Sequence, residues 1–356
     1  MIRPLRVLHV MHDSRRSGVP AVVYALLTSF DRTEIMPSVF FAYDGVYADD
    51  LRRAGVEVVT LGDRTPLLWR VKRFLGIFLL PWLLRKCDIM HAHSVKMAPM
   101  ALVAKLLGAT VVFHLHEKAD KGWLLRAIMA RADRVIYCAE NCAEHYAEIP
   151  VRSSQVILNA IRLPEKQTPV PTRSRSVVMF GSINANKGQD LLVKAFAALQ
   201  PLDAVLYLYG TIGLSARSFV AGLREFVGTN GLKDVIRFPG PTQNAPDVFK
   251  RAYLLVHSSL NECLSISLLE AMAYGVPVVA NDIAGMREII IDGVNGFVVP
   301  VGSVESMAEK MKLLLTDVEL WERISSAGLR TVAEQFDMRT RVVEFVLMYQ
   351  AVAGAK

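Results

Sequence analysis

Two acids lie close to the start of an expected helix in the second half of the chain. The segment Ser259 to Ala280 reads SLNECLSISLLEAMAYGVPVVA and carries Glu262 and Glu270 with seven residues between them. The apolar run LLVHSS before it predicts a buried strand, and SISLLEAMAYG predicts a helix that ends at Gly275. Loops between a strand and the next helix lie at the carboxyl edge of a parallel sheet, where ligands bind. We therefore expect this segment to line a binding site.

The start of this helix predicts an anion site. Its first backbone N–H groups, expected at Leu264, Ser265 and Ile266, would attract a phosphate through hydrogen bonds and the helix dipole. Glu270 is about five residues into the helix, hence ~7–8 Å along its axis, and could bind a neutral diol such as a ribose. Glu262 would then lie on the sugar side of a nucleotide diphosphate. Alternatively, Glu262 is an acid favoured by the helix dipole and Glu270 a solvated surface residue.

Two histidine pairs could bind a metal ion. His91-x-His93 and His114-x-His116 each place two imidazoles on one face of a strand, and such pairs can ligate zinc. A third ligand, Asp or Cys at a strand end, would be needed, and the sequence offers no persuasive one. We therefore expect no metal site, with His91 and His114 as hydrogen-bonded, partly buried residues. A metal-dependent hydrolase that uses the pairs is the alternative.

Short apolar runs alternate with helical patterns along all 356 residues. This alternation predicts an α/β protein with two doubly wound parallel sheets that hold a ligand in the cleft between them. A proline-containing stretch without periodicity, 162–176, predicts the linker. The expected strands are 6–11, 36–43, 57–61, 88–93, 110–116, 134–139, 176–182, 204–210, 235–240, 254–259, 276–281 and 295–299. The expected helices are 21–30, 100–108, 188–199, 215–229, 264–274, 304–315, 318–335 and 338–352.

The charge of the chain favours an anionic partner. The net charge is +7, and residues 1–165 hold 22 lysines and arginines against 16 acids, which is most of the excess. We expect no nucleic-acid partner. The four cysteines form no CxxC pair and the N-terminus shows no signal-peptide pattern, so a reducing cytosol is expected.

The segment 66–86 suggests contact with a membrane. Its apolar core LGIFLLPWLL has ten residues, too few to span a bilayer, which takes ~20. Four aromatic residues and flanking arginines and lysines favour a helix that lies on an anionic membrane surface. The protein would then be cytoplasmic and peripheral at the inner membrane face. The alternative is a buried helix with solvated ends.

The loop after the first strand, HDSRRSGVPAVV, disfavours a nicotinamide enzyme. It has one glycine, Gly18, where the dinucleotide fingerprint needs three. Ser17 and Gly18 could still bring N–H groups near an anion or an acceptor at the start of a helix.

Several motifs, taken together, resemble one family. NECLSISLLEAMAYGVPVVANDIAGMREIIIDGVNGFVVP (261–300) contains E-x7-E, GVPVVA, AG-x-x-E-I-I and DG-x-NG-F in order. Further matching segments are FGSINANKGQDLLVKAF (180–196), FPG (238–240), DIMHAHS (88–94), FHLHE (113–117) and VILNAIRL (156–163). Over nearly its whole length the chain resembles the retaining glycosyltransferases of family 4, which have the GT-B fold of two Rossmann-like domains.

The resemblance implies a role for each matching residue. Glu270 would bind the ribose, Glu262 would lie near the donor sugar and diphosphate, and Lys187 would neutralise the diphosphate. His116 would contact the donor sugar near its reacting centre. Gly18 would lie where the first-domain loop closes on the sugar or acceptor.

Three further positions follow from the same motifs. Phe238 and Gly240 belong to the strand whose backbone meets the nucleotide base. Ser182 replaces the family's arginine beside the phosphates, so one expected cation is missing. The alternative is therefore a homologue that binds nucleotide sugar without transferring it.

The resemblance also implies a domain division and a reaction. An acceptor-binding domain would span 1–165, a nucleotide-sugar-binding domain 166–336, and a C-terminal helix in 337–356 would pack on the first domain. The enzyme would move a sugar, with retention, from a UDP- or GDP-sugar to a saccharide or polyprenyl-diphosphate-linked acceptor in cell-envelope polysaccharide synthesis. We expect no cofactor and, since no DxD element is present, no metal.

Overall fold

The chain forms two compact units. The computed structural model describes residues 3–62, 69–165, 175–242 and 244–354. Unit 1 comprises Met1–Arg162 and Asp337–Lys356, and unit 2 comprises Leu163–Phe336. The division falls at the start of the expected linker 162–176, most of which lies outside the described residues.

Unit 1 is built on a seven-stranded sheet in the order β3-β2-β1-β4-β5-β6-β7, with parallel pairing throughout. Its strands are β1 (Leu5–Met11), β2 (Ile35–Phe41), β3 (Glu57–Thr60), β4 (Ile89–His93), β5 (Val111–Leu115), β6 (Arg134–Tyr137) and β7 (Ser154–Val156). Its helices are α1 (Gly18–Ser29), α2 (Val46–Arg53), α3 (Trp69–Leu84), η1 (Val95–Met97), α4 (Ala98–Leu106), α5 (Trp123–Met129), α6 (Glu140–Tyr146) and α14 (Met338–Gly354).

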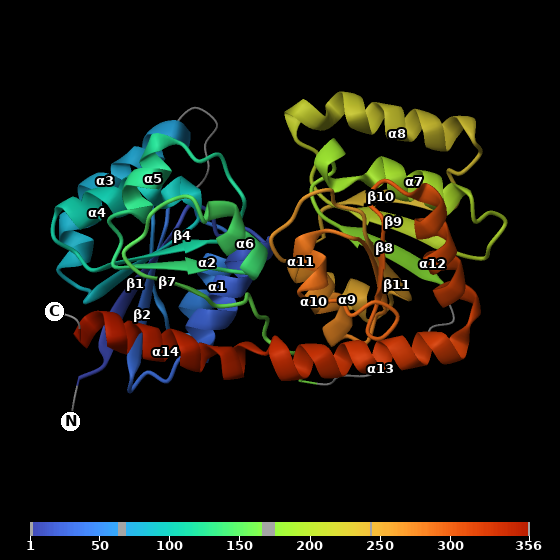
Figure 1. Ribbon diagram of the computed structural model, residues 1–356. Coiled ribbons are helices and arrows are strands. Elements are labelled where there is room, and N and C mark those ends of the chain that lie inside the picture. The colour runs from blue at the N-terminus through green and yellow to red at the C-terminus, as the bar shows by residue number, and fades with distance from the viewer. Residues whose placement is uncertain (1–2, 63–68, 166–174, 243, 355–356) are drawn as a thin grey trace. The chain divides into compact units, whose positions relative to one another are not determined.

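Helices cover the central strands of this sheet, which explains their sequences. Every residue of β4 and β5 is buried, as expected for parallel strands packed on both faces. Helix α3 packs on α4 and α4 on α5, while α14 packs on α1 (Figure 1). The C-terminal helix joins unit 1 through the backbone, because Met338 N donates to Ile161 O at 2.8 Å.

Unit 2 has a six-stranded parallel sheet in the order β10-β9-β8-β11-β12-β13. Its strands are β8 (Ser176–Phe180), β9 (Val205–Tyr209), β10 (Ile236–Gly240), β11 (Leu254–His257), β12 (Val278–Asn281) and β13 (Phe297–Val299). Its helices are η2 (Ala185–Lys187), α7 (Gln189–Ala197), η3 (Leu214–Ala216), α8 (Arg217–Thr229), α9 (Ala245–Phe249), α10 (Ile266–Ala273), α11 (Ala284–Arg287), α12 (Val304–Thr316) and α13 (Val318–Gln335).

Two parallel sheets of this kind confirm the α/β class predicted from the sequence. Helix α12 packs on α7 and α13, and α13 on α10, so both ends of the unit 2 sequence share one core. Trp321 anchors α13, because its Nε1 donates to Tyr253 O at 2.8 Å. The sequence did not predict β7, which has only three residues, none of them fully buried, and therefore no apolar run.

Helix α3 has both a buried and an exposed apolar side. Leu80 and Leu83 are buried, whereas Phe78 is 80% exposed and Trp82 is 46% exposed. Residues 66–68 of the expected membrane segment lie outside the described part, as do the side chains of 69–75. Within the described residues, no helix has the length and apolar character needed to cross a bilayer.

Candidate active site

The order in which the chain adds strands to the unit 2 sheet reverses between β8 and β11. Strands β9 and β10 continue on one side of this pair, and β12 and β13 continue on the other. Such a switch point leaves a crevice at the carboxyl ends of the two strands. Lys187 ends η2 after β8, and Glu262 lies in the loop after β11. The structure joins them: Lys187 Nζ forms an ion pair with Glu262 Oε1.

Glu262 is held by further groups from its own loop and from the end of β11. Ser259 Oγ donates to Glu262 Oε1 at 3.4 Å, and His257 Nε2 lies 3.7 Å from the same oxygen. About a quarter of each partner's side chain stays exposed, 25% for Lys187 and 22% for Glu262. The cation is therefore oriented by the protein and still accessible to a ligand.

The backbones of the two loops are in direct contact. Ser258 Oγ donates to Lys187 O at 3.0 Å, and Leu260 N donates to Asn186 O at 2.9 Å. Gly188 has φ +65°, and a Cβ there would lie 2.2 Å from Ser258 O. Only glycine satisfies both conditions, so its place after Lys187 fixes the approach of the two loops.

Helix α10 begins at Ile266, two residues later than the 264 expected from the sequence. Ser265 is the N-cap, and its Oγ accepts from Leu268 N at 3.4 Å. A serine side chain can satisfy a first-turn N–H group, which is why the helix starts after it. Leu264 and Ser265 therefore precede the helix, and the first helical N–H groups are those of Ile266 and Ser267.

Glu270 occupies the second turn of α10 and is half-buried. Burial raises the pKa of nearby Tyr274, and the negative charge of Glu270 contributes to the rise.

The remaining predicted residues of unit 2 lie near three neighbouring strands. Ser182 follows β8, and its Oγ accepts from Asn184 Nδ2 at 3.1 Å. Phe238 lies in edge strand β10 with the Arg224 guanidinium 5.8 Å from its ring centre. Gly240 has φ +84°, and its carbonyl accepts from Gly210 N at 3.1 Å.

The predicted residues of unit 1 follow β1 and β5. Gly18 is exposed and opens α1 after the N-cap Ser17. His116 follows β5 and is 7% exposed. Its Nδ1 lies 3.1 Å from Asn159 Oδ1 and its Nε2 lies 3.2 Å from His93 Nδ1. A ligand that bonds to either ring nitrogen would have to exchange one of these contacts.

His116 belongs to a larger cluster that the sequence did not predict. His9 on β1 joins the two predicted histidine pairs, and all five side chains are buried. Burial lowers the pKa of His9 to about 3 and that of His116 to about 4, and those of the other three well below the usual value. The imidazoles are therefore neutral at pH 7. The expectation of a hydrogen-bonded, partly buried His114 is wrong, because neither of its nitrogens has a partner among the described residues.

The buried His257 should make the stability of unit 2 sensitive to acid. Burial lowers its pKa from 6.5 to about 4, so the unfolded chain takes up a proton between these values and the folded chain does not. The free energy of unfolding should therefore fall as the pH drops through this window, by up to about 3 kcal/mol from this residue. Denaturant unfolding of the wild type and His257→Gln at pH 7.5 and 4.5 measures this. The variant should lose less stability, and an equal loss would contradict the assignment.

Comparisons with known proteins match both units. Residues 162–331 match the model "Glycosyl transferases group 1", and residues 7–160 match "Glycosyl transferase 4-like domain". The chain is 27% identical to the lipopolysaccharide core biosynthesis mannosyltransferase LpsB of Rhizobium meliloti (strain 1021), over 84% of this chain and 90% of the relative. It is also 27% identical to the corresponding LpcC of Rhizobium leguminosarum bv. viciae, over 85% and 90%.

Solved structures show the same fold. HepE of Anabaena, solved with UDP and glucose, superposes with a TM-score of 0.85 at 19% identity, over 98% of this chain and all of that one. The lipopolysaccharide outer core galactosyltransferase WaaB, in its apo form, superposes with a TM-score of 0.71 at 17% identity, over 97% of this chain. Two Rossmann-like units of the GT-B type are thus established.

Proposed function

Because the chain belongs to the glycosyltransferases, which both domain models describe, we propose that it transfers a sugar from a nucleotide-diphosphate sugar to a glycan acceptor. The donor is a UDP- or GDP-sugar and the acceptor a saccharide or polyprenyl-diphosphate-linked saccharide of a cell-envelope polysaccharide. Two relatives named as lipopolysaccharide core mannosyltransferases and a structural neighbour solved with UDP-glucose support this proposal. The transfer retains the anomeric configuration, as in family 4.

The observation that carries the proposal is the placement of Lys187. Its ammonium group and the first N–H groups of α10 belong to loops that follow the two strands at the switch point. Both groups attract a diphosphate. Glu262 orients the lysine through the ion pair and lies near the donor sugar.

These groups act on charge that develops as the bond breaks. The C1–O bond of the donor sugar opens, its electron pair passes to the β-phosphate, and positive charge grows on the sugar ring. Lys187 and the start of α10 stabilise the phosphate. The acceptor hydroxyl bonds to C1 from the same face, and its proton passes to the departing phosphate.

The other predicted residues surround the donor. Glu270 accepts hydrogen bonds from the ribose hydroxyl groups. The backbone at Phe238 and Gly240 meets the base. His116 and Gly18 in unit 1 contact the sugar and the acceptor.

A nucleotide screen tests this function. Thermal unfolding with UDP, GDP and their sugars should show a rise in melting temperature for one base, because a ligand bound only to the folded state stabilises it. Release of that nucleotide from its sugar should then require a lipid-linked saccharide acceptor. Absence of any nucleotide effect would refute the proposal.

Ser182 favours a second candidate function. With serine where the family has an arginine, unit 2 has one cation fewer for the diphosphate, and a protein that binds nucleotide sugar without transferring it would fit this loss. Binding without acceptor-dependent release in the screen would support that candidate.

Both matching domain models describe transferases, which speaks against the hydrolase alternative.

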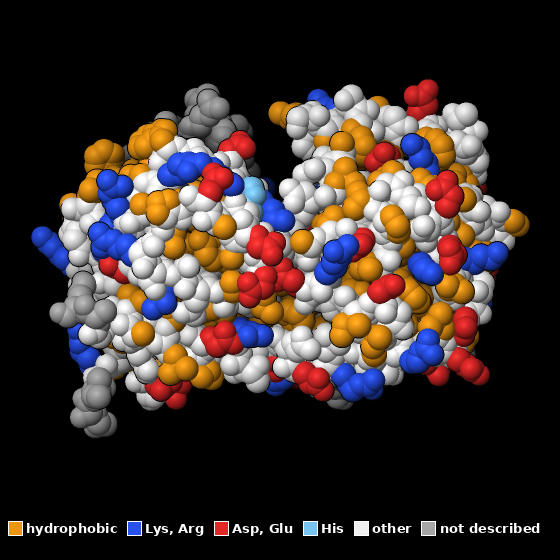
Figure 2. Space-filling view, in the orientation of Figure 1, with side chains coloured by type: hydrophobic (Ala, Val, Ile, Leu, Met, Phe, Trp, Pro, Cys, Tyr) orange, Lys and Arg blue, Asp and Glu red, His pale blue; other side chains and the backbone are white. Residues whose placement is uncertain are grey.

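The surface of unit 1 suggests that the protein works on an anionic membrane at the cytoplasmic side. Exposed apolar side chains lie on α3 to α5 and at their ends (Figure 2), namely Phe78, Trp82, Leu106, Leu107 and Trp123. Lys86 Nζ lies 3.9 Å from the centre of the Trp82 ring, so a cation accompanies the apolar group. This combination suits the interface of an anionic bilayer.

Liposome flotation should detect this contact. Phe78→Ser and Trp82→Ser should each weaken binding to anionic vesicles by about 10-fold or more, because burying a large apolar side chain contributes ~1.5–3 kcal/mol. Leu214→Ser removes a comparably exposed side chain from unit 2 and should have no effect. Equal flotation of all variants would remove the membrane proposal and leave the donor site untouched.

A further inference from the structure

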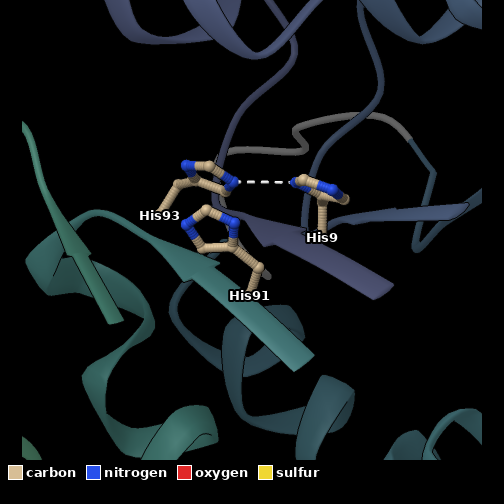
Figure 3. A group of neighbouring side chains, drawn as sticks. All are labelled: His9, His91 and His93. Carbon is tan, nitrogen blue, oxygen red and sulfur yellow. Dashed lines mark hydrogen bonds between the residues drawn. The ribbon is translucent and has the colours of Figure 1, made fainter. Parts of the chain in front are cut away.

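Five neutral histidines lie together inside unit 1: four on the adjacent strands β1, β4 and β5, and His116 directly after β5. His9 is paired in register with His91 across β1 and β4, and His93 with His114 across β4 and β5. His116 is two residues beyond His114, on the same side of the strand. Figure 3 shows His9 and His93 joined by a hydrogen bond, with the ring of His91 beside that of His93.

A chain of hydrogen bonds defines where their protons are. Asn159 Oδ1 can only accept, so His116 Nδ1 carries its proton and Nε2 is bare. His116 Nε2 then accepts from His93 Nδ1 at 3.2 Å, and His93 Nε2 accepts from His9 Nδ1 at 2.9 Å. The chain ends at His9 Nε2, which has no partner among the described residues.

His114 takes no part in this chain of hydrogen bonds. Its ring centre is 3.8 Å from that of His116 and 5.4 Å from that of His93, yet neither nitrogen has a hydrogen-bond partner in the described chain. A buried polar group without a partner carries a free-energy cost, because it has lost its hydrogen bonds to water. A ligand that accepts the lone pair of His114 would remove this cost.

We propose that His93, His114 and His116 bind a zinc ion. One nitrogen of each lies within 4.8 Å of the others. The 3.2 Å between His93 Nδ1 and His116 Nε2 is close to the ~3.3 Å that separates two ligands of a tetrahedral zinc with Zn–N bonds of 2.0–2.1 Å. Three imidazoles and no carboxylate favour Zn²⁺ over Mg²⁺ or Ca²⁺.

Two of the three ligands already have the outer contacts that metal-bound histidines need. A ligating imidazole donates its second N–H group to an acceptor that fixes its orientation. His116 Nδ1 donates to Asn159, and His93 Nε2 can donate to His9 Nδ1 once zinc occupies its Nδ1. The protons of His93 and His9 each move to the other nitrogen of the same ring, so every imidazole stays neutral and no proton is released.

The site leaves the fourth position of zinc for a water molecule. All three ligands are buried: His93 and His114 are at most 1% exposed, and His116, at 7%, is the least enclosed of them. Three histidines and a water are a known zinc ligand set. The site uses His116, which the proposed function assigns to the donor sugar, so metal binding is measured without donor or acceptor, and its failure would leave the donor site of unit 2 untouched.

Cobalt titration tests the site directly. Full-length protein stripped with a chelator should bind one Co²⁺ per chain with the visible absorption of a tetrahedral ion, and Zn²⁺ should displace it. His114→Gln should weaken binding at least 100-fold. His145→Gln, which changes a histidine outside the cluster, should leave it unchanged. Absence of Co²⁺ binding, or undiminished binding to His114→Gln, would overturn the proposal.

Three further measurements test which residues are the ligands. Asn159→Ala should weaken metal binding 10- to 100-fold, although His116 itself is unchanged. X-ray absorption of the zinc-loaded wild type should show nitrogen ligands with imidazole scattering and no sulfur. If His91→Gln abolishes binding and His114→Gln does not, the ion lies instead among His9, His91 and His93, which refutes the assignment made here.

Discussion

Replacing Lys187 with glutamine should reduce the rate of sugar transfer about 10²- to 10³-fold, the usual cost of losing one fixed donor to a developing negative charge. Glutamine keeps much of the side-chain length and removes the charge that the departing diphosphate needs. The rate is measured as acceptor-dependent nucleotide release with the donor that the screen identifies. The fall should appear mainly in kcat, because the charge on the phosphate grows in the transition state.

The control for this variant is Lys194→Gln. Lys194 lies on α7 of the same unit and is exposed, so the variant loses the same charge away from the crevice. Its activity should equal that of the wild type. Because Lys187→Gln also leaves Glu262 without its ion-pair partner, unfolding of both variants should be compared. A Lys187→Gln enzyme that folds and retains wild-type kcat would show that the diphosphate binds elsewhere.

Glu270→Ala should weaken nucleotide binding by about 10- to 100-fold. Hydrogen bonds to a charged group contribute about 1.5–3 kcal/mol, and 1.4 kcal/mol is a factor of ten in Kd. Calorimetric titration with UDP or GDP measures the change. The loss should be similar for the nucleotide and for the nucleotide sugar, since the carboxylate is assigned to the ribose that both contain.

An exposed acid on another helix of unit 2 serves as the comparison. Glu225 lies on α8, and Glu225→Ala should leave Kd unchanged. A deoxyribose nucleotide, which lacks the 2′-hydroxyl, provides a second test. The difference in Kd between the wild type and Glu270→Ala should be smaller for this nucleotide than for the ribose form. Wild-type affinity of Glu270→Ala for UDP and GDP would place the ribose outside this helix.

Most strands and helices were predictable because their signals are local. Buried parallel strands consist of apolar runs, so β4, β5 and β11 lie within the ranges expected from the sequence. Helix ends depend on single side chains, and here the prediction was less accurate. Ser265 caps α10 and moves its start to Ile266, which no periodicity shows.

The residues of unit 2 that could bind an anion were also visible as motifs. The sequence placed Lys187 after one strand and Glu262 after another. Only the strand order could show that β8 and β11 are neighbours and that the two side chains form an ion pair. Their roles toward a donor remain predictions for the variants above.

The sequence by itself determined that this chain forms two α/β units and which short segments lie at their loops, because apolar periodicity and turn residues act within a few positions. The tertiary structure alone decided which distant residues meet. His9 and His93 lie on two strands and His116 directly follows a third, and these positions are spread over more than a hundred residues. Asn159 reaches His116 from 43 positions further along the chain. Parallel strands can be paired in many orders with similar local patterns, so the contacts of side chains across a sheet follow from packing, which no single segment encodes.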